Sequence, residues 1–484
     1  MKEPRVEYLA RAQRSATERD DAHTLQRLLS GPQLIVLGIG AIVGAGIFVS
    51  TGLVAAEHTG PAIVYSFVLA GLGCLCAALC YAEFAALVPV SGSAYSYVSA
   101  AFGQGCGWVI GWCLILEYLM AAANVAVGWS GYFGSLLGSV GIAIPSGWSS
   151  PTFVVSAARG LTRTGAVVNL PAVAVLAVLA VLLNRGLRLS VRTSTVLVAI
   201  KLTVIGLFVV FGAAYVVPAN WRPFVPPNDG TFGAFGWSGV LRGAGMIFYA
   251  YLGFDTVAAA ARETRNPQRA VPVGLLGSLL ACTLIYIAFA LVLTGLAPYR
   301  ALAAPNPVSV ALGYAGPQLY FLKLAVEIGA VVGLTSVVLV LLYAQSRVIY
   351  AMAQDRLLPR AFCRIDPATR SPSVAVVVCG VVAAIAAGLF SIDVLSELIS
   401  MGTLCAFVFV CASVLYLRIT RPALGRPFRV PLAPLVCGLG VAICGYLMLG
   451  MPAGTWWRFL AWLVIGAAIY LLYGRRAAGG PRVH

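Results

Sequence analysis

Charged residues are scarce in this chain. Of its 484 residues only 10% are charged and 60% are hydrophobic, whereas a soluble domain carries about 25% charged residues. Acidic residues are the rarest, with 16 Asp and Glu against 32 Lys and Arg. The basic residues are spread over short segments, so the net charge of +16 does not indicate nucleic-acid binding. A soluble enzyme is excluded, and the long apolar runs predict a polytopic membrane protein.

Signatures of catalysis and cofactor binding are also missing. The chain has three histidines and twelve cysteines without a C-x-x-C pair, so we expect no metal site. No Walker pattern and no triad of nucleophile, base and orienting residue occurs, so we expect neither an ATP-driven pump nor an enzyme, and no cofactor. The polar stretch before the first apolar run does not resemble a cleavable signal peptide.

Apolar runs long enough to cross a bilayer occur twelve times. They lie near residues 33–54, 62–88, 104–137, 167–184, 194–217, 239–259, 271–296, 318–345, 373–391, 394–417, 432–450 and 457–473. With both termini in the cytoplasm, the inside segments carry 24 Lys and Arg and the outside segments carry 6. This asymmetry follows the positive-inside rule. It predicts a cytoplasmic-membrane protein with residues 1–32 and 474–484 as cytoplasmic tails.

Two of these runs are interrupted at matching places. The first contains four glycines between Gly38 and Gly46, and the sixth contains Phe248-Tyr-Ala-Tyr-Leu-Gly253-Phe-Asp255. Five spans separate them, and because five is odd, a repeat of residues 33–217 in residues 239–417 must be inverted. The last two helices, 432–473, lie outside the repeat. The predicted fold is all-α, with twelve transmembrane helices, a five-plus-five inverted repeat, and helices 1 and 6 unwound at the midplane.

Gly44 and Gly46 are expected to weaken the first span, because each glycine lowers helix stability by about 1 kcal/mol. An unwound turn is tolerated in lipid only where it faces a cavity. Its free N–H groups attract a carboxylate, and freed carbonyls of the opposite half-helix attract an ammonium. Such a pair suits the two ends of a zwitterionic amino acid. The alternative is that Gly40-x-x-x-Gly44 is a small-residue contact between helices.

An ordered set of motifs resembles one transporter family. The motifs are the run Gly38 to Phe48; Tyr81-Ala-Glu83 with Pro89, Ser91, Gly92, Tyr95 and Tyr97; Gly111-Trp112 with Leu116-Glu117-Tyr118; Gly253-Phe-Asp255 with Glu263 and Asn266-Pro267-Gln268-Arg269; Gly333-Leu-Thr335; and Gln345-Ser-Arg347 with Tyr350, Asp355 and Pro359. They run from span 1 to span 9. The chain is identified as a member of the amino acid-polyamine-organocation (APC) superfamily and is most similar to the bacterial cationic amino acid transporter branch.

The resemblance implies that substrate is held between helices 1 and 6, with help from helices 3, 8 and 10. The backbone groups that would bind the substrate carboxylate are those of Ile42, Gly44, Ala45 and Gly46. The residues that would meet the substrate ammonium and cover it are Tyr249, Ala250 and Leu252, with Tyr249 as the gate. Ala45 stands where related sequences often have Thr or Ser, which removes a hydroxyl ligand. Arg262 stands where the branch usually has an acid.

Ionisable residues inside spans are costly, so each is a candidate for function. Lys201 has apolar neighbours on every face. The resemblance places its ammonium beside the unwound part of helix 1, where sodium-coupled relatives hold a cation. We expect Lys201 to replace sodium and to exchange protons, and a permanently charged tether between helices 5 and 1 is the alternative. Glu117 and Asp255 could pair with Lys201; for Asp255, capping a half-helix competes with proton relay.

Glu327 is expected close to the midplane, about 15 Å along span 8. If it faces the pocket, it would receive the cationic end of arginine, lysine or ornithine and select the substrate side chain. If it faces Lys323, one turn earlier, the two form a local i,i+4 pair. Glu83, near the cytoplasmic end of span 2, is too shallow for the central site and is expected to be a packing or gate residue.

These observations predict a secondary active permease for amino acids that works by alternating access. Protons are the expected coupling ion, with Lys201 in place of sodium. Obligatory exchange of one amino acid or polyamine for another is an alternative mechanism, and a receptor that binds an amino acid without moving it is an alternative function. The expected partners are a small amino acid, protons and the lipid bilayer. The sequence does not indicate an oligomeric state, nor whether the substrate is cationic or small and neutral.

Overall fold

The computed structural model describes residues 30–87, 94–156, 160–186, 191–254, 257, 264, 266–366, 369 and 371–474. Its first helices are α2 (Gly31–Ile42), α3 (Thr51–Val54), α4 (Ile63–Leu87), α5 (Ala94–Phe102), α6 (Gln104–Ser139), α7 (Ser146–Ser149), α8 (Leu170–Asn184) and α9 (Val191–Ala213). The later helices are α10 (Gly236–Ile247), α12 (Pro267–Leu296), α13 (Pro307–Tyr314), α14 (Tyr320–Gln354), α15 (Ser373–Leu389), α16 (Ile392–Thr420), α17 (Ala433–Leu449) and α18 (Ala453–Ile469). Two short strands, β1 (Phe153–Ser156) and β2 (Gly160–Arg163), pair antiparallel.

Short irregular helices complete the chain. The π-helical segments are η1 (Gly46–Ser50), η2 (Ala55–Thr59) and η10 (Tyr470–Gly474). The 3-10 segments are η3 (Gly60–Ala62), η4 (Pro218–Trp221), η5 (Phe248–Tyr251), η7 (Tyr299–Leu302), η8 (Pro317–Leu319) and η9 (Arg360–Cys363). π-Helical turns are rare and are frequent at functional sites. Two of the three, η1 and η2, lie just after the first predicted break and are separated by the short helix α3.

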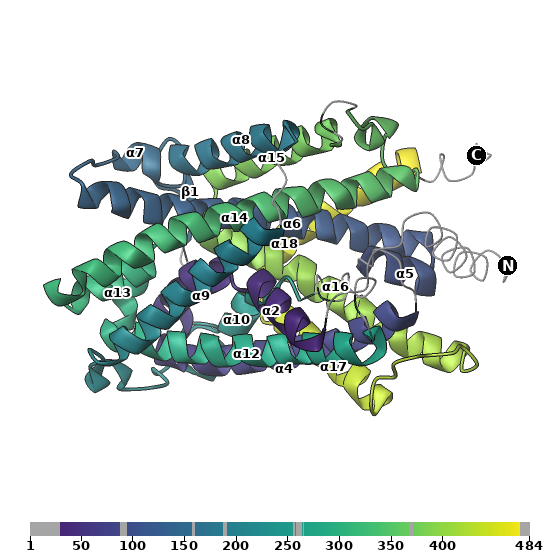
Figure 1. Cartoon of the computed structure of the whole chain (residues 1–484), viewed down its shortest axis with the longest axis horizontal. Helices are drawn as coiled ribbons and strands as arrows, with labels where there is room; N and C mark the ends of the chain where they lie inside the picture. Colours follow the sequence, from purple (N-terminus) through teal and green to yellow (C-terminus); the bar gives the residue numbers. More distant parts are fainter. Residues whose placement is uncertain are drawn as a thin grey trace.

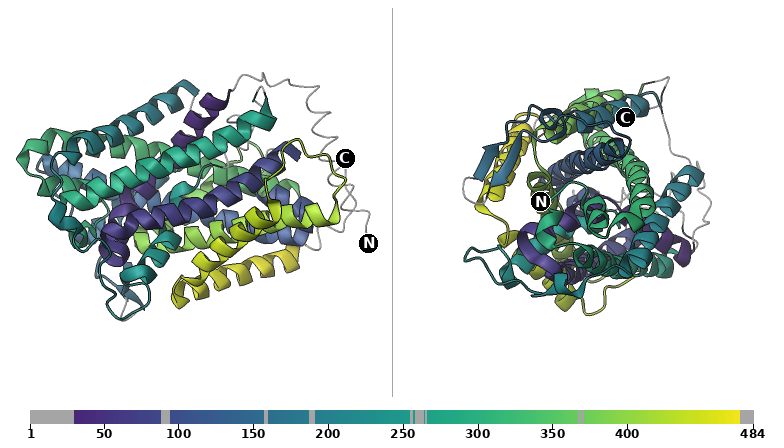
Figure 2. Two further views of the ribbon diagram at one scale, coloured as in Figure 1. Left: turned by 90° about the horizontal axis from the view of Figure 1, so that it is seen from below. Right: turned by 90° about the vertical axis from the view of Figure 1, so that its left-hand side faces the viewer.

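Most long helices run along one direction (Figures 1 and 2). Seven helical runs of the described residues are long and apolar enough to cross a membrane, and four shorter apolar helices accompany them. Each of the twelve apolar runs overlaps helix in the described residues, with interruptions in the first and the sixth run. One apolar run ends before its helix does, because α14 continues beyond residue 345 to Gln354. Polar residues such as Gln345 and Arg347 end an apolar run, but they do not end a helix.

The interrupted ends of α2 and α10 are buried within the bundle, since Ile42 is 3% exposed and Ile247 is fully buried. The helix α2 stops at Ile42, and Val43 has the extended angles φ −70° and ψ 105°. The chain becomes helical again in η1. The helix α10 passes into η5, after which Leu252 is extended and Gly253 has φ +112°. The interruptions therefore lie where the glycine pattern predicts them.

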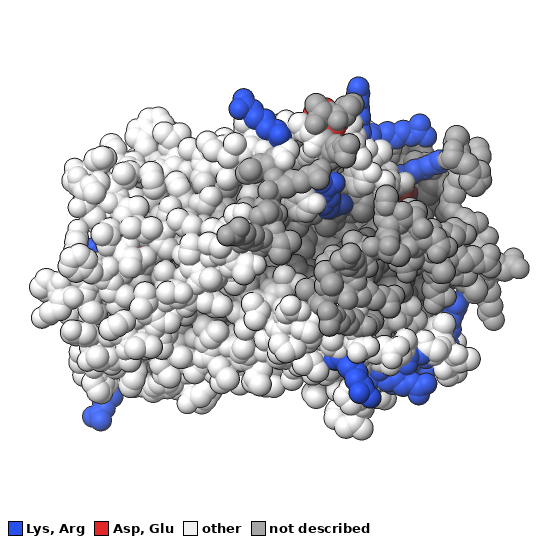
Figure 3. Space-filling view, in the orientation of Figure 1, with Lys and Arg blue, Asp and Glu red and all other residues white. Residues whose placement is uncertain are grey.

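The two ends of the bundle differ in charge. We define the outer end as the end where α10, α16 and α18 begin, and the inner end as the end where α6 begins and α14 ends. On the face seen in Figure 3, Lys and Arg gather over the half near α5 and α17, while the other half is almost free of charge. Arg360, Arg364 and Arg429 are exposed basic residues. By the positive-inside rule this inner end is expected to face the cytoplasm.

Candidate functional site

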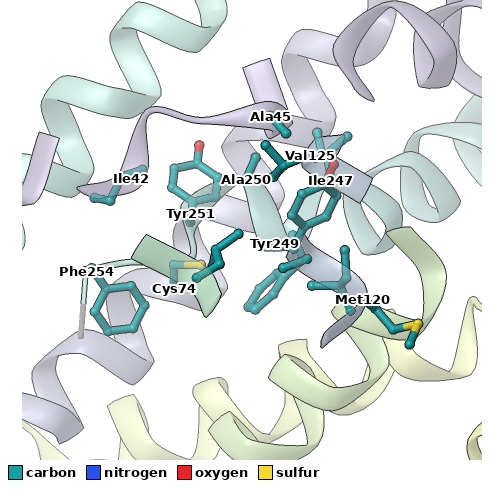
Figure 4. Close-up of a cluster of buried hydrophobic side chains, with 14 of the residues drawn as sticks. Ile42, Ala45, Cys74, Met120, Val125, Ile247, Tyr249, Ala250, Tyr251 and Phe254 are labelled. Carbon is teal, nitrogen blue, oxygen red and sulfur yellow. The ribbon is translucent and has the colours of Figure 1, made fainter. Parts of the chain in front are cut away.

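The two helix breaks touch each other at glycines. A Cβ atom on Gly46 would lie 2.4 Å from Cβ of Ala250, and a Cβ on Gly253 would lie 2.6 Å from the carbonyl oxygen of Ala41. Figure 4 shows Ala45 close to Ala250, with Val125 of α6 beside them. Gly44 behaves differently, because its Cβ would meet Val337 at an ordinary 3.6 Å. The close approach of the breaks therefore requires Gly46 and Gly253, but it does not require Gly44.

Side chains of neighbouring helices satisfy the carbonyls that the breaks release. The hydroxyl of Tyr286, on α12, is shared between the carbonyl oxygens of Ala250 at 2.7 Å and Ile42 at 3.1 Å. The hydroxyl of Tyr132, on α6, donates to the carbonyl of Phe48 in η1 at 2.6 Å. Each unsatisfied group would cost several kcal/mol in an apolar interior. The broken backbone is therefore held in place by the surrounding helices.

Lys201, on α9, is a further side chain that bonds to carbonyls released by the break in helix 1. Its Nζ donates to the carbonyl oxygens of Gly40 at 3.1 Å and Val43 at 3.0 Å, and the residue is 4% exposed. A Cβ on Gly333 of α14 would lie 2.8 Å from Cγ of Lys201, so the lysine stem passes directly over that glycine. The ammonium lies where the last carbonyls of α2 point, which is the end of a helix that attracts a cation.

A buried polar cluster closes the outer side of the break. Asn124 of α6 donates through Nδ2 to the hydroxyls of Tyr249 at 2.8 Å and Ser396 at 2.9 Å. The hydroxyl of Tyr249 also bonds that of Ser50 in η1. We call these four residues, Ser50, Asn124, Tyr249 and Ser396, the outer seal. Each is at most 5% exposed, so the outer seal is buried within the protein beside the break.

The inner side of the break is less enclosed. Leu252 and Gly253 are only partly buried, although they lie midway along the chain of helix 6. The first N–H groups of the outer half of helix 1, which begins near Ala45, have no intrahelical acceptor. The arrangement can bind an anion at these N–H groups, with Tyr249 above it. Of the predicted substrate residues, Ile42, Ala45, Gly46, Tyr249 and Ala250 are brought together here.

Of the remaining charged candidates, Glu327 is engaged by residues of α6 and α14. Glu327 is fully buried, but its Oε1 accepts from the hydroxyl of Ser135 at 2.6 Å and lies 3.9 Å from Nζ of Lys323. Glu117 lies on α6, where a Cβ on Gly402 of α16 would be 3.5 Å from its own Cβ. Asp255 lies outside the described residues.

A family model described as amino acid permease matches residues 29–470. The chain belongs to the amino acid permease family. It is 42% identical over 453 residues to a methylthioribose transporter of Bacillus subtilis, covering 94% of each chain. It is equally 42% identical over 455 residues to a branched-chain amino acid permease of the same organism, again covering 94% of each. It is 35% identical to an Arabidopsis thaliana vacuolar cationic amino acid transporter over 84% of the permease and 65% of that relative.

Membership of this family confirms the resemblance to the APC superfamily and the conclusion that the chain is not an enzyme. It also makes the permease a multi-pass membrane protein. Sequence reasoning missed several residues of the site, namely Ser50, Asn124, Tyr132, Tyr286 and Ser396. A usable signal was present for Asn124, which is an amide within an apolar run of α6. The tyrosines gave no such signal, because tyrosine is common in apolar cores and only the structure shows which carbonyls their hydroxyls meet.

The permease also has a charged cluster at its inner end, built on Glu83. This buried carboxylate accepts from Arg418 at 3.1 and 2.5 Å, lies 3.3 Å from Nε of Arg426, and accepts from the backbone N–H of Val430 at 2.8 Å. The cluster ties the end of α4 to α16 and to the segment before α17. Glu83 is therefore a packing residue between helices.

Replacing Glu83 by alanine is expected to destabilise the permease by about 3 kcal/mol, because removing one partner of a buried ion pair leaves the other uncompensated. A lower melting temperature in detergent would report this loss. Asp229→Ala is the matched control, since Asp229 and Arg300 form an exposed pair that contributes at most about 1 kcal/mol. Equal melting temperatures for both variants would contradict a structural role for Glu83.

Proposed function

We propose that the permease is a secondary active transporter that carries amino acids by alternating access, coupled to protons through Lys201. In this proposal twelve helices cross the cytoplasmic membrane with both termini inside, helices 1–5 and 6–10 form an inverted repeat, and substrate binds at the two breaks. The observation that carries the proposal is the position of the Lys201 ammonium on the carbonyls of Gly40 and Val43.

Lys201 supports proton coupling because its ammonium group, which can lose a proton, lies at the break in helix 1. Sodium-dependent transport needs a metal ion on freed carbonyls of helix 1, and here an ammonium takes that place. If the proton leaves Lys201, the neutral amine keeps two N–H donors but loses its attraction for the negative end of α2. Helix 1 would then be freer to move relative to α9. Substrate carboxylate at the N–H groups near Ala45 would favour the charged lysine again, since opposite charges stabilise one another.

Proteoliposomes that contain the purified permease test this coupling. An inward proton gradient is expected to drive accumulation of substrate above its external concentration, and acidification of the lumen should follow substrate addition. If uptake does not depend on the proton gradient but requires substrate inside the liposomes, the mechanism is exchange and not symport. If labelled substrate binds to the permease but does not enter the liposomes, the result would support a receptor and contradict transport.

For the substrate, the structure favours a neutral side chain. The carboxylate of Glu327 is already engaged by Ser135 and Lys323, so it is not free for a guanidinium or ammonium group. The outer seal offers hydroxyl and amide groups, and Met120 and Val125 add apolar surface beside Tyr249 (Figure 4). One similar protein is named for branched-chain amino acids and another for methylthioribose. We therefore place leucine, isoleucine, valine and methylthioribose first among the compounds to test.

The variant Glu327→Gln should lower uptake of leucine and arginine by the same factor, because its carboxylate acts on Ser135 and Lys323 and not on substrate. Competition assays with both amino acids measure this ratio. A loss restricted to arginine, of about tenfold or more, would show that Glu327 selects the substrate side chain after all.

A further inference from the structure

Glu397 joins three helices at the outer end of the bundle. This residue of α16 is 1% exposed, and its Oε1 lies 3.3 Å from Nη2 of Arg242 on α10. Its Oε2 lies 3.7 Å from Nη2 of Arg458 on α18 and also accepts from the hydroxyl of Thr455 on the same helix. One buried carboxylate is therefore shared by two guanidinium groups, and each group approaches a different oxygen atom.

The helix that carries Arg458 is bound to the same neighbour as α16, which is α6. The indoles of Trp112 on α6 and Trp462 on α18 donate to each other's backbone carbonyls, at 2.8 and 3.0 Å. A Cβ on Gly402 of α16 would lie 3.0 Å from the carbonyl oxygen of Cys113 on α6. Because α16 and α18 are both held on α6, we treat these three helices as one packed group.

Arg242 is held by other neighbours. Its helix, α10, contacts the outer end of helix 1 so closely that a Cβ on Gly239 would lie 2.0 Å from the carbonyl oxygen of His58. The hydroxyl of Ser66, on α4, donates to the carbonyl of Val240 in α10 at 2.8 Å. The ion pair of Arg242 therefore links α10, packed on helix 1 and α4, to the group of α6, α16 and α18.

The contact between α10 and α16 is polar at the outer end and aromatic farther in. Three residues after Glu397, the hydroxyl of Ser400 donates to the carbonyl of Met246 in α10 at 3.1 Å. Farther along α16, the ring centroid of Phe407 lies 5.5 Å from that of Phe248 in η5. Polar groups that separate can bond water instead, whereas separated aromatic rings expose apolar area to water. This change along the contact favours a separation that begins at the outer end.

We propose that Arg242 and Glu397 form an outer latch, which holds α10 against α16 and breaks when the permease opens to the outside, while Arg458 stays on Glu397. This inference rests on the proposed alternating access. A buried carboxylate that loses its only cationic partner is strongly destabilised. The second guanidinium group and the hydroxyl of Thr455 prevent this loss, so the outer latch can open and close again.

The two arginines therefore act in opposite directions on the equilibrium between the closed and the open form. Without Arg242, the closed form loses an ion pair and the open form is unchanged, so the permease opens more often. Without Arg458, the open form leaves Glu397 without a counter-ion, while the closed form keeps Arg242, so the permease opens less often. Two arginines that only stabilised the fold would not shift this equilibrium in opposite directions.

Labelling of a reporter thiol measures the opening. Ser396→Cys places a thiol one residue before Glu397, where the native side chain is 1% exposed. A neutral, membrane-impermeant maleimide is applied to right-side-out membrane vesicles that contain the full-length permease, and vesicles without the reporter substitution give the background. Combined with the reporter, Arg242→Gln should raise the labelling rate at least about fivefold, and Arg458→Gln should lower it at least about fivefold.

Asp229→Asn is the matched control, because Asp229 and Arg300 form an exposed pair, and it should leave the labelling rate unchanged. Glu397→Gln is the second test variant. It should also raise the rate, because the closed form then brings two guanidinium groups together without the carboxylate. Gel filtration establishes that each variant is monodisperse.

If Arg242→Gln and Arg458→Gln change the labelling rate in the same direction, or if neither changes it, the outer latch is wrong. Gradient-driven accumulation of substrate by the wild type in proteoliposomes would in that case leave the proposed function standing. Absence of this accumulation would instead remove the proposed function. The failure of the outer latch and the failure of the proposed function are therefore distinguishable.

Discussion

Lys201→Met is expected to abolish accumulation driven by a proton gradient. The variant removes the ammonium that donates to the carbonyls of Gly40 and Val43, and methionine fills the same space without a titratable group. Uptake against a concentration gradient should fall at least tenfold, to the level of protein-free liposomes. Exchange of labelled for unlabelled substrate at equal pH should persist, because exchange needs the site but needs no net proton movement.

Lys323→Met is the matched control for this variant. Lys323 also lies in a predicted span, but its partner is Glu327 and it is 29% exposed, so gradient-driven uptake should stay above half of the wild-type rate. The two roles of Lys201 predict different results. A pure tether would lose exchange and accumulation together and would lower the melting temperature, since hydrogen bonds to charged groups contribute about 1.5–3 kcal/mol each. Normal gradient-driven uptake by Lys201→Met would remove the coupling role.

The positions of the helices could be predicted well from the sequence because apolar length is a local property. A run such as 394–417 has to cover a bilayer, and α16 covers that run. The two breaks were also predictable, since Gly44, Gly46 and Gly253 weaken helix locally. The end of α14 was not, because a helix continues in water after its apolar run has ended.

The candidate site was predicted less completely, because its groups meet across long sequence separations. In the sequence, Tyr286 lies 244 residues from Ile42 and 36 residues from Ala250, and no periodicity connects the three. The ion pairs of Glu397 on α16 are similar, since their partners Arg242 and Arg458 come from α10 and α18 and share no motif with it. Sequence named Lys201 because a charge inside an apolar run is rare. The sequence could not identify the hydroxyl and amide partners, because such residues are common in apolar spans and only the fold shows which of them contact one another.

Gly46→Ala is expected to stop transport in all modes, including exchange. The new Cβ would lie 2.4 Å from Cβ and 2.5 Å from Cα of Ala250. Because one of these atoms is backbone, the conflict cannot be relieved by a rotamer change, and the two breaks would have to separate. Such overpacking costs about 1–3 kcal/mol, which corresponds to up to ~100-fold in a binding constant. Substrate binding and transport should therefore fall together, by about fivefold to 100-fold.

Gly44→Ala is the matched control, because it makes the same chemical change two residues earlier in the same break. Its Cβ would lie 3.6 Å from Val337, an ordinary contact, so uptake should stay within about threefold of the wild type. Uptake and substrate affinity, measured in parallel for Gly46→Ala and Gly44→Ala, distinguish the two explanations that follow. Equal loss in both would mean that any methyl group in the unwound turn blocks substrate directly. Selective loss in Gly46→Ala ties binding to the contact between the two half-helices, since only that variant forces them apart.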